Sequence, residues 1–351
     1  MKKVILLFLF PVLSHIVMGQ QQNERVLKLV DEGIEMHDEG DYKGALAKYD
    51  EALKIDKDNA LALGEKALTL FALRQYKESL QCAERAINKN PESDALRSVY
   101  VTYGNAYDNL KEPDKALAAY DKGIKLFPGE HQLYYNKGVT LVGMKRYDEA
   151  MTCFQQLALL NPNHPGTQHA IASLADAKGM RIPALMAYCR FLVLEPVGER
   201  AKMDFGSLQR ILKKGVEQKD GNTIGITLDE NIVSDKKKEN DFGIADMTLL
   251  LQAALDYSDE NKEKTDVELF IAKLETLCAS LSESQKDNYG FFWDYYAPYF
   301  SEIRNKKLIE PFAYLLFVNG GGPDVGKWIK SHKSDLEKFY AWSLSFEWKK
   351  N

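Results

Sequence analysis

Few side chains in this sequence stand at spacings that support chemistry, and the first candidate is a histidine. His169 could serve as a metal ligand or a general base, but neither a carboxylate nor a cysteine lies at helical ligand spacing from it. His164 precedes it by five residues, a poor separation for two ligands on one helix face. We therefore expect His169 to be structural or solvent-exposed, and the sequence predicts no metal site.

The sequence also lacks the motifs of common enzyme classes. It has neither the G-x-S-x-G elbow of a serine hydrolase nor the H-E-x-x-H helix of a zinc protease, and no dinucleotide-binding glycine fingerprint. The run from Gly320 to Pro323 lacks the Gly-Lys-Ser/Thr of a phosphate-binding loop and is interpreted as a turn. The four cysteines have no C-x-x-C spacing and are expected to be structural. No enzyme, catalytic residue or cofactor is predicted.

The N-terminus has the features of an export signal. Lys2 and Lys3 precede an apolar run from Val4 to Val12, which is too short to span a bilayer comfortably. The residues Val17-Met18-Gly19 suit cleavage before Gln20. We expect residues 1–19 to be a signal peptide and the mature protein to be periplasmic or secreted, without stable membrane insertion. The alternative is a retained membrane anchor.

The charge of the chain argues against a nucleic-acid partner. The formal net charge is −5, and it becomes −7 when the two lysines of the signal are removed. The one lysine run, residues 236–238, is followed at once by Glu239 and Asp241, so it is interpreted as a solvated loop. Phosphate binding needs clustered cations, which this sequence lacks.

The dominant pattern is an internal repeat in the first half of the chain. Small residues recur at intervals of 34, 37, 34 and 34, at Ala45, Ser79, Ala116, Ala150 and Ala184. Twelve residues before each of them lies another small residue, at Gly33, Ala67, Gly104, Gly138 and Ala172. An aromatic residue follows four places after most of the first set, at Tyr49, Tyr120, Phe154 and Tyr188. Small residues let two antiparallel helices approach closely, so the pattern predicts stacked helical hairpins.

This pattern resembles the tetratricopeptide repeat (TPR) family over about half of the chain, from Arg25 to Pro196. The resemblance implies an all-α fold, a right-handed TPR α-solenoid of about five helical hairpins plus a cap, followed by a mostly helical C-terminal domain. Residues 25–215 are expected to form the solenoid with its capping helix, in which Phe205, Leu208 and Ile211 are spaced for burial. The interval of 37 predicts three additional residues, placed near Pro91 to Ala95.

The resemblance also implies where a ligand would bind, because TPR arrays use the first helix of each hairpin to line a concave groove. The corresponding positions of the first two units include Leu27, Asp31, Glu65 and Leu68. The later units have no cation there, which argues against a carboxylate-binding TPR. They supply a neutral hydrogen-bonding strip suited to an extended peptide, consisting of Thr102, Asn105, Asp108, Asn109, Tyr135, Asn136 and His169.

The motifs of the second half do not identify a family. Residues 216–243 are expected to be a linker, with a possible β segment at 223–228 that could pair with residues 231–233. Residues 244–351 are expected to form a helical C-terminal domain, with one apolar stripe at Met247, Leu250, Leu251, Ala254 and Leu255. A dense aromatic segment, residues 289–300, could be the core of this domain or a stacking platform.

Two functional hypotheses follow. The first is a non-enzymatic protein- or peptide-binding scaffold or adaptor of the cell envelope that uses the concave TPR groove. The second is a glycan-binding or glycan-processing accessory protein whose stacking platform includes Trp293, Tyr295 and Tyr296. The second hypothesis requires those rings to be exposed.

Overall fold

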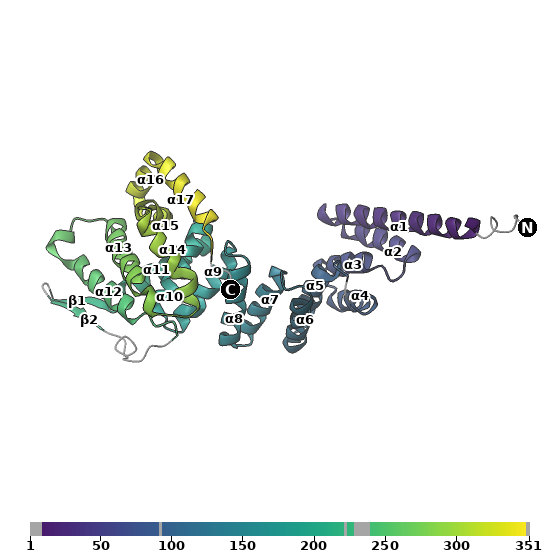
Figure 1. Ribbon diagram of the computed structural model, residues 1–351, viewed down its shortest axis with the longest axis horizontal. Coiled ribbons are helices and arrows are strands. Elements are labelled where there is room, and N and C mark those ends of the chain that lie inside the picture. The colour runs from purple at the N-terminus through teal and green to yellow at the C-terminus, as the bar shows by residue number, and fades with distance from the viewer. Residues whose placement is uncertain (1–8, 91–92, 221–222, 228–238, 349–351) are drawn as a thin grey trace, which may run out of the picture. The chain divides into compact units, whose positions relative to one another are not determined.

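The structure, a computed structural model, describes residues 9–90, 93–220, 223–227 and 239–348 (Figure 1). The chain divides into two compact units, an N-terminal unit (Met1–Cys153) and a C-terminal unit (Phe154–Asn351). The predicted signal peptide lies partly outside the described residues, and Leu9 to Gly19 continue into the first helix. In the described part of the chain, no helix combines the length and the apolar character needed to cross a membrane.

The N-terminal unit is an unbroken series of helices joined by short turns. Its helices are α1 (Leu9–Asp38), α2 (Tyr42–Ile55), α3 (Ala60–Ala72), α4 (Tyr76–Lys89), α5 (Leu96–Asn109), α6 (Pro113–Leu126), α7 (His131–Gly143) and the first part of α8 (Tyr147–Leu160). We number the hairpins in chain order, so that α1 and α2 are hairpin one and α7 and α8 are hairpin four. The predicted helical hairpins are confirmed.

The contacts between these helices arrange them in two layers. Helix α1 packs on α2, α3 on α4 and α5 on α6, and each of α2, α4 and α6 packs on the first helix of the next hairpin. The first helices also contact one another, α1 with α3, α3 with α5 and α5 with α7. The first helices therefore form one continuous layer, whose exposed side is called the first-helix face below.

The small residues of the repeat lie where the two helices of a hairpin approach most closely. A Cβ atom added to Gly33 would overlap with the ring of Tyr49, and one added to Gly104 would overlap with the ring of Tyr120. Both rings are buried. The periodic glycine and the periodic tyrosine thus form a matched pair, because the ring occupies the space that the missing side chain leaves.

Each hairpin turns at a residue with left-handed backbone. The φ angles are positive at Gly40, Arg74, Lys111, Lys145 and Gly179, which repeat at the same intervals as the small residues. The following N–H donates to a carbonyl five residues back, as from Gln75 to Leu70 at 2.8 Å, which closes the C-terminus of the first helix. Three of the five turns use a residue other than glycine, so the sequence pattern alone did not reveal them.

The interval of 37 residues has a local explanation. Residues 90–95 connect α4 to α5, whereas residues 56–59 and 127–130 make the equivalent connections in the neighbouring hairpins. Helix α5 also has 14 residues, whereas α3 and α7 have 13. Two of the three extra residues therefore lie in the connection, where they were expected, and the third lies in α5. Pro91 and Glu92 themselves lie outside the described residues.

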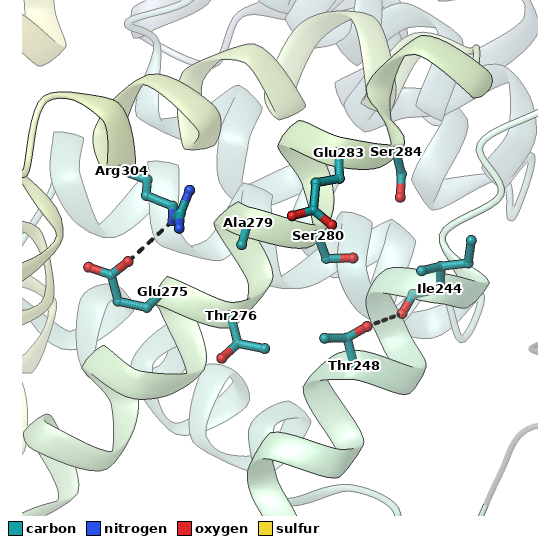
Figure 2. Close-up of a pocket in the computed structure, with 9 residues that line it drawn as sticks. All are labelled: Ile244, Thr248, Glu275, Thr276, Ala279, Ser280, Glu283, Ser284 and Arg304. Atoms are coloured by element: carbon teal, nitrogen blue, oxygen red, sulfur yellow. Dashed lines mark hydrogen bonds and ion pairs between the residues drawn. The ribbon is translucent and has the colours of Figure 1, made fainter.

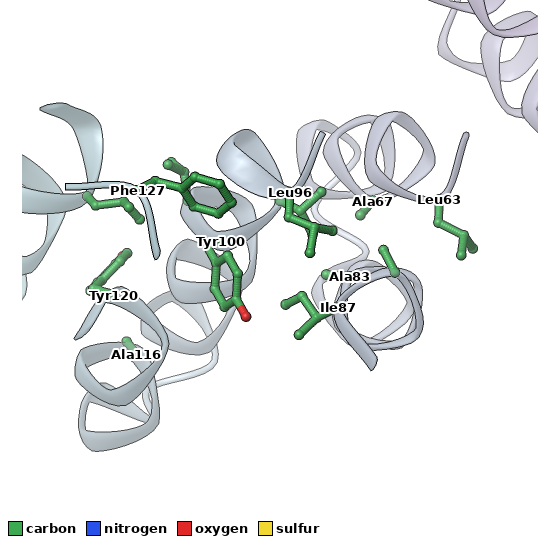
Figure 3. Close-up of a cluster of buried hydrophobic side chains, with 13 residues drawn as sticks. Leu63, Ala67, Ala83, Ile87, Leu96, Tyr100, Ala116, Tyr120 and Phe127 are labelled. Atoms are coloured by element: carbon green, nitrogen blue, oxygen red, sulfur yellow. The ribbon is translucent and has the colours of Figure 1, made fainter. Parts of the chain in front are cut away.

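One apolar cluster joins hairpins two, three and four. Figure 3 shows the ring of Tyr100 between Phe127 on one side and Leu96 and Ile87 on the other. The ring centroids of Tyr100 and Phe127 are 6.2 Å apart. The cluster takes residues from α3 through α7, so each hairpin completes its core with side chains of its neighbours.

The C-terminal unit contains the end of the array and the remaining helices. After α8 come α9 (Pro165–Ala177), α10 (Arg181–Leu194), α11 (Glu199–Lys213), α12 (Gly243–Ala254), α13 (Asp266–Ser284), α14 (Phe291–Asn305), α15 (Ile309–Leu316), α16 (Gly322–Ser331) and α17 (Lys333–Ser345). Among the described residues, short 3₁₀ helices lie at 255–257, 259–261, 285–287 and 317–319. Helices α9 and α10 form hairpin five. Helix α11 packs on α10 and buries Phe205, Leu208 and Ile211, as predicted for the capping helix.

Helix α10 places hairpin five in the C-terminal unit. Every residue from Arg181 to Val193 is buried, because α10 contacts α9, α11, α12, α14 and α15. Apart from Arg181 and Arg190 these residues are apolar, and a helix that is apolar on nearly all sides is typical of a core position. Hairpin five therefore packs as part of the C-terminal unit, and the sequence-based boundary at 215/216 differs from the division of the structure at 153/154.

The segment after α11 contains a short antiparallel hairpin. Strand β1 (Val216–Asp220) pairs with β2 (Thr223–Ile226), with Val216 opposite Ile226 and Gln218 opposite Ile224. The predicted β segment is therefore present, but its partner is the preceding segment. Residues 231–233, the partner considered from the sequence, lie outside the described residues.

The apolar stripe predicted for α12 was out of phase. Leu250 is buried, but Leu251 and Leu255 are 54% and 51% exposed. The buried side of α12 is formed instead by Ala245, Leu249, Leu250 and Ala253. Two of these positions are alanines, which are only weakly hydrophobic. The more hydrophobic leucines at 251 and 255 therefore indicated the wrong face of the helix as the buried one.

Candidate binding surface

The first-helix face of hairpins three and four brings together the two asparagines that the sequence analysis singled out. Asn136 Nδ2 on α7 donates a hydrogen bond to Asn105 Oδ1 on α5, at 2.8 Å. The hydroxyl of Tyr120 donates a second bond to the same Asn105 oxygen, at 2.7 Å. With its oxygen accepting twice, the Asn105 amide is held in one orientation, and the Asn136 side-chain oxygen has no hydrogen-bond partner among the described residues. This arrangement suits the N–H groups of an extended peptide.

The other predicted residues of α5 and α7 divide between the face and the interior. Asp108 and Tyr135 are half-buried. Burial raises the pKa of Tyr120, and the negative charge of Asp108 adds to the increase. Thr102 is only 3% exposed, so it packs inside the layer and does not contact a ligand in this conformation. Asn109 is exposed, but its Nδ2 donates to the carbonyl of Asn105 at 2.9 Å and completes the last turn of α5. Asn105 and Asn136 are thus the polar centre of this part of the face.

His169 belongs to the C-terminal unit, and it has a carboxylate partner that the sequence did not reveal. Its Nδ1 lies 2.7 Å from Asp204 Oδ2, and Asp204 on α11 is only 3% exposed. The ring also lies against Phe191, with centroids 5.6 Å apart. The two partners are 35 residues apart, so no local spacing could show the pair. Within the described residues no group of three or more His, Cys, Asp or Glu side chains could hold a metal ion.

Hairpins one and two present a different chemistry on the same layer of helices. Leu27 and Leu68 are 41% and 36% exposed, and the carboxylates of Asp31 and Asp38 are also exposed. Glu65 on α3 is half-buried, and burial together with the nearby charge of Asp38 raises the pKa of its carboxyl group. The repeat pattern alone does not distinguish this acidic and apolar part of the face as a site.

Several other carboxylates of the N-terminal unit are paired with cations. Asp50 on α2 lies 2.5 Å from Lys66 Nζ on α3, and Asp121 on α6 lies 2.5 Å from Lys137 Nζ on α7. Both pairs join a second helix to the first helix of the next hairpin with the same spacing of 16 residues. These periodic bridges fix neighbouring hairpins, and they leave no net charge for a ligand.

The aromatic segment of the C-terminal unit is a core and not a stacking platform. Trp293, Tyr295 and Tyr296 are each at most 2% exposed. Their polar atoms point inward: Trp293 Nε1 donates to the Asp241 carbonyl at 2.9 Å, and the Tyr295 hydroxyl to the Ala158 carbonyl at 3.2 Å. The hypothesis of a glycan platform on these rings is therefore wrong, because a sugar cannot reach them.

A buried arginine lies at the centre of this aromatic core. Arg190 on α10 is fully buried, and its guanidinium donates to Asn163 Oδ1 and, at 2.7 Å, to Ser343 Oγ on α17. It also lies over the rings of Tyr299 and Trp348, 5.2 and 4.9 Å from their centroids. Aromatic faces and neutral oxygens stabilise this cation, which has no carboxylate partner among the described residues. Its role is to join hairpin five to the C-terminal helices.

The C-terminal unit also has a polar pocket of about 390 Å³ between α12, α13 and α14 (Figure 2). Thr248 Oγ1 donates to the Ile244 carbonyl at 2.7 Å, and Arg304 pairs with Glu275 at 3.4 Å. The Ser280 hydroxyl is buried and has no hydrogen-bond partner among the described residues. The pocket lining holds two carboxylates, Glu275 and Glu283, beside the Arg304 guanidinium, and it contains no histidine, lysine or cysteine.

Comparison with known proteins agrees with the repeat. Residues 24–175 match the family model described as the N-terminal TPR repeats region of Psidin. Tetratricopeptide repeat protein 33 of Mus musculus is 28% identical over 111 residues, 32% of this chain and 41% of that protein. The small glutamine-rich tetratricopeptide repeat-containing protein of Dictyostelium discoideum is 26% identical over 185 residues, 53% of this chain and 52% of that protein. The chain thus spans about half of these relatives or less.

A solved structure, that of Pseudomonas aeruginosa pilF, is similar in fold. It is 20% identical, with a TM-score of 0.50, and the match covers 55% of this chain and 85% of that one. At this identity the likeness concerns the fold alone.

Proposed function

The chain is a tetratricopeptide repeat protein, and from that premise we propose that it is a non-enzymatic scaffold that binds a protein or peptide partner through the first-helix face of its N-terminal unit. TPR proteins are typically protein-interaction scaffolds, and the C-terminal helices would hold the end of the array in place.

One observation carries the proposal, the amide pair formed by Asn105 and Asn136. The bond between them joins two neighbouring first helices, and the Tyr120 hydroxyl fixes the orientation of the pair. A peptide lying across α5 and α7 would find the donor and acceptor groups of Asn136 already positioned, so little side-chain entropy would be lost on binding.

The cleanest variant for a test is Asn136→Ala. Replacing Asn105 would leave the buried Tyr120 hydroxyl without its acceptor, which costs about 1–3 kcal/mol of stability. Asn136 is half-buried and donates only this one bond within the described residues. We expect Asn136→Ala to weaken partner binding by about tenfold, equivalent to about 1.4 kcal/mol, with a melting temperature close to that of the wild type.

The experiment is site-specific photo-crosslinking in the cell that makes the protein. A photoreactive amino acid is placed at Val139, which is 47% exposed on α7, or at Leu126, which is 38% exposed on α6. We expect a discrete crosslinked polypeptide from Val139 that Asn136→Ala diminishes. Equal crosslinking from Leu126, or a Val139 product that Asn136→Ala leaves unchanged, would rule out the first-helix face.

We further propose that the protein is exported and acts in the cell envelope as an adaptor. The support is the basic pair and short apolar run at the N-terminus. Val26 and Val30, which pack in the core of hairpin one, lie after the expected cleavage point, so removal of residues 1–19 would keep this packing. Mass spectrometry of the mature protein should find Gln20 as its first residue; an N-terminus at Met1 would contradict export by this signal.

A further inference from the structure

Three carboxylates lie on the first-helix face of hairpins one and two, and some acidic groups on other faces of the array are held in ion pairs. Among the described residues, Asp31, Asp38 and Glu65 have no lysine or arginine partner, whereas Asp50, Asp121 and Glu149 are all ion-paired. In hairpins one to four, the positions equivalent to Asp31 and Leu68 hold no lysine or arginine at all. The negative charge of this part of the face is therefore not neutralised within the unit.

A comparison between equivalent hairpins shows that a buried hydroxyl next to this part of the face lacks the hydrogen bond that its counterpart makes. Tyr49 and Glu65 occupy the positions that Tyr120 and Asn136 occupy two hairpins later. Tyr120 donates to Asn105, but the residue equivalent to Asn105 is Ile34, so the buried Tyr49 hydroxyl has no acceptor of good geometry among the described residues. Burial raises the pKa of Tyr49 to about 12, and the charges of Glu65 and Asp38 contribute to the increase. The tyrosine therefore lies close to both carboxylates.

Apolar side chains accompany these charges. Leu27 and Leu68 are 41% and 36% exposed, and Ile34 between them is half-buried. A ligand for this part of the face must bring positive charge to Asp38 and Glu65 and apolar groups to the leucines. Keeping Glu65 half-buried beside Asp38 without a cation lowers the stability of the free protein. A cation from a partner would reverse that cost, which gives specificity for one sign of charge.

We propose that Leu27, Asp31, Asp38, Glu65 and Leu68 form a docking site for a cationic amphipathic segment, a peptide in which lysines or arginines recur beside apolar residues. This inference rests on the proposed function and adds the chemistry of the partner. The neutral amides of Asn105 and Asn136 would contact the peptide backbone, and the acidic site would select its side chains.

The test measures binding of three fluorescent peptides of equal length to the full chain by fluorescence anisotropy. Their polar residues are all lysine, all glutamine or all glutamate, and their apolar residues are all leucine. We expect the lysine peptide to bind at least about tenfold more tightly than the glutamine peptide, and the glutamate peptide to show no binding. Raising the salt concentration should weaken binding of the lysine peptide.

Two double variants separate a local site from the general negative charge of the protein. Asp38→Asn with Glu65→Gln removes two negative charges from the docking site, and Asp121→Asn with Glu149→Gln removes two from second helices. We expect the first pair to weaken binding of the lysine peptide about tenfold and the second pair to change it less than twofold. Equal losses in the two double variants, or equal binding of the lysine and glutamine peptides, would overturn the proposal.

The photo-crosslinking experiment at Val139 stays independent of this result. A natural partner captured through Val139, in a protein that does not prefer the lysine peptide, would overturn the acidic docking site and leave the proposed function standing. Selective binding of the lysine peptide without any partner crosslinked at Val139 would support the docking site and contradict the use of hairpins three and four.

Discussion

Hairpin three and hairpin five have the same repeat pattern but different surroundings. In hairpin three, α6 keeps one side in solvent, with Asp121 reaching across to Lys137 on the next hairpin. In hairpin five, every residue of α10 from Arg181 to Val193 is buried, and a cation lies in the middle of the helix. The same arrangement of small residues and aromatic rings thus permits either an exposed helix or a core helix. The residues between the repeat positions decide which of the two forms.

The largest effect is expected from Arg190, on which this contrast depends most. Arg190→Ala would leave Asn163 Oδ1 without this donor, would leave the Tyr299 and Ser343 hydroxyls with only their bond to each other, and would open a cavity among the rings. We expect a loss of about 3–5 kcal/mol in the free energy of unfolding, measured by urea titration. Arg210→Ala is the matched control, because that side chain is 57% exposed and its ion pair with Asp176 is worth less than about 1 kcal/mol. Similar losses in both variants would mean that Arg190 does not stabilise the core.

Amide hydrogen exchange would show which helices the loss of Arg190 destabilises. Amide hydrogen exchange in Arg190→Ala should accelerate in α9, α11, α12, α14 and α15, which pack with α10, and should change little in α3 to α6. Uniform acceleration throughout the chain would show that hairpin five and the N-terminal unit unfold together. Hairpin three and hairpin five would then not differ in local stability.

The next largest effect concerns the glycine and tyrosine pair of the exposed hairpins. In Gly104→Ala the new Cβ would overlap with the Tyr120 ring, so we expect a loss of about 1–3 kcal/mol. Gly143→Ala is the control in the same unit, because nothing lies within 4 Å of its added Cβ atom, and it should be neutral or slightly stabilising. Thermal unfolding of the two variants compares them directly. A loss in Gly143→Ala as large as in Gly104→Ala would contradict the steric explanation.

This pair shows how far the sequence predicts the fold. Glycine and tyrosine recur in phase, so the hairpins, their order and the neighbourhood of Asn105 and Asn136 follow from the period. Arg190 finds its partners 27, 109 and 153 residues away, and His169 finds Asp204 35 residues away. Such pairs depend on how the C-terminal helices fold back onto α10, and no local pattern records that.

For the candidate site, the sequence predicted which helices carry the residues but not which side chains are buried or unpaired. Asn105 and Asn136 were placed on neighbouring first helices by the repeat, and the structure joins them. Thr102 was assigned to the same surface, but whether a residue at the edge of a helix face is buried depends on the neighbouring helix, and here it is inside. The acidic site was overlooked because a carboxylate becomes notable only when its neighbours leave it unpaired, which requires the three-dimensional structure.

A smaller effect is expected at the hairpin turns, where the two hairpins use different residues for one conformation. Lys145 has φ 62°, and Gly179 at the equivalent position of hairpin five has φ 72°. Lys145→Gly should gain about 0.5–1 kcal/mol, because relief of left-handed strain exceeds the added freedom of the unfolded chain. Gly179→Ala should lose about 1 kcal/mol by the same reasoning, since nothing lies within 4 Å of its added Cβ atom. Chemical denaturation gives both values, and changes of the same sign would contradict this account.

The smallest effect is expected at Glu65, with a dependence on pH. Its pKa in the folded protein is raised above its ordinary value of 4.5, chiefly by burial and also by the charge of Asp38, so protonation stabilises the folded state. The wild type therefore gains stability from this group as the pH falls through the raised pKa and loses it as the pH rises. Glu65→Gln should be more stable than the wild type at pH 7, by on the order of 0.5 kcal/mol.

The pH series supplies the control for Glu65. The advantage of Glu65→Gln should disappear below about pH 4, where the wild-type carboxyl is also neutral. Melting temperatures at several pH values would show this convergence. A constant difference at all pH values would point to a packing change instead. A variant that is more stable yet binds the lysine peptide less well would show that binding specificity is retained at the expense of stability.

The complete burial of α10 has a consequence for how an array of this kind can change length over evolutionary time. An inserted copy of hairpin two or three would meet neighbours of its own kind, because the bridges Asp50–Lys66 and Asp121–Lys137 recur with the same spacing. A duplicated hairpin five would need a second set of partners for Arg190 and a second cover for α10. Gain and loss of repeats should therefore be confined to the exposed hairpins. Hairpin five should remain the last hairpin of the array.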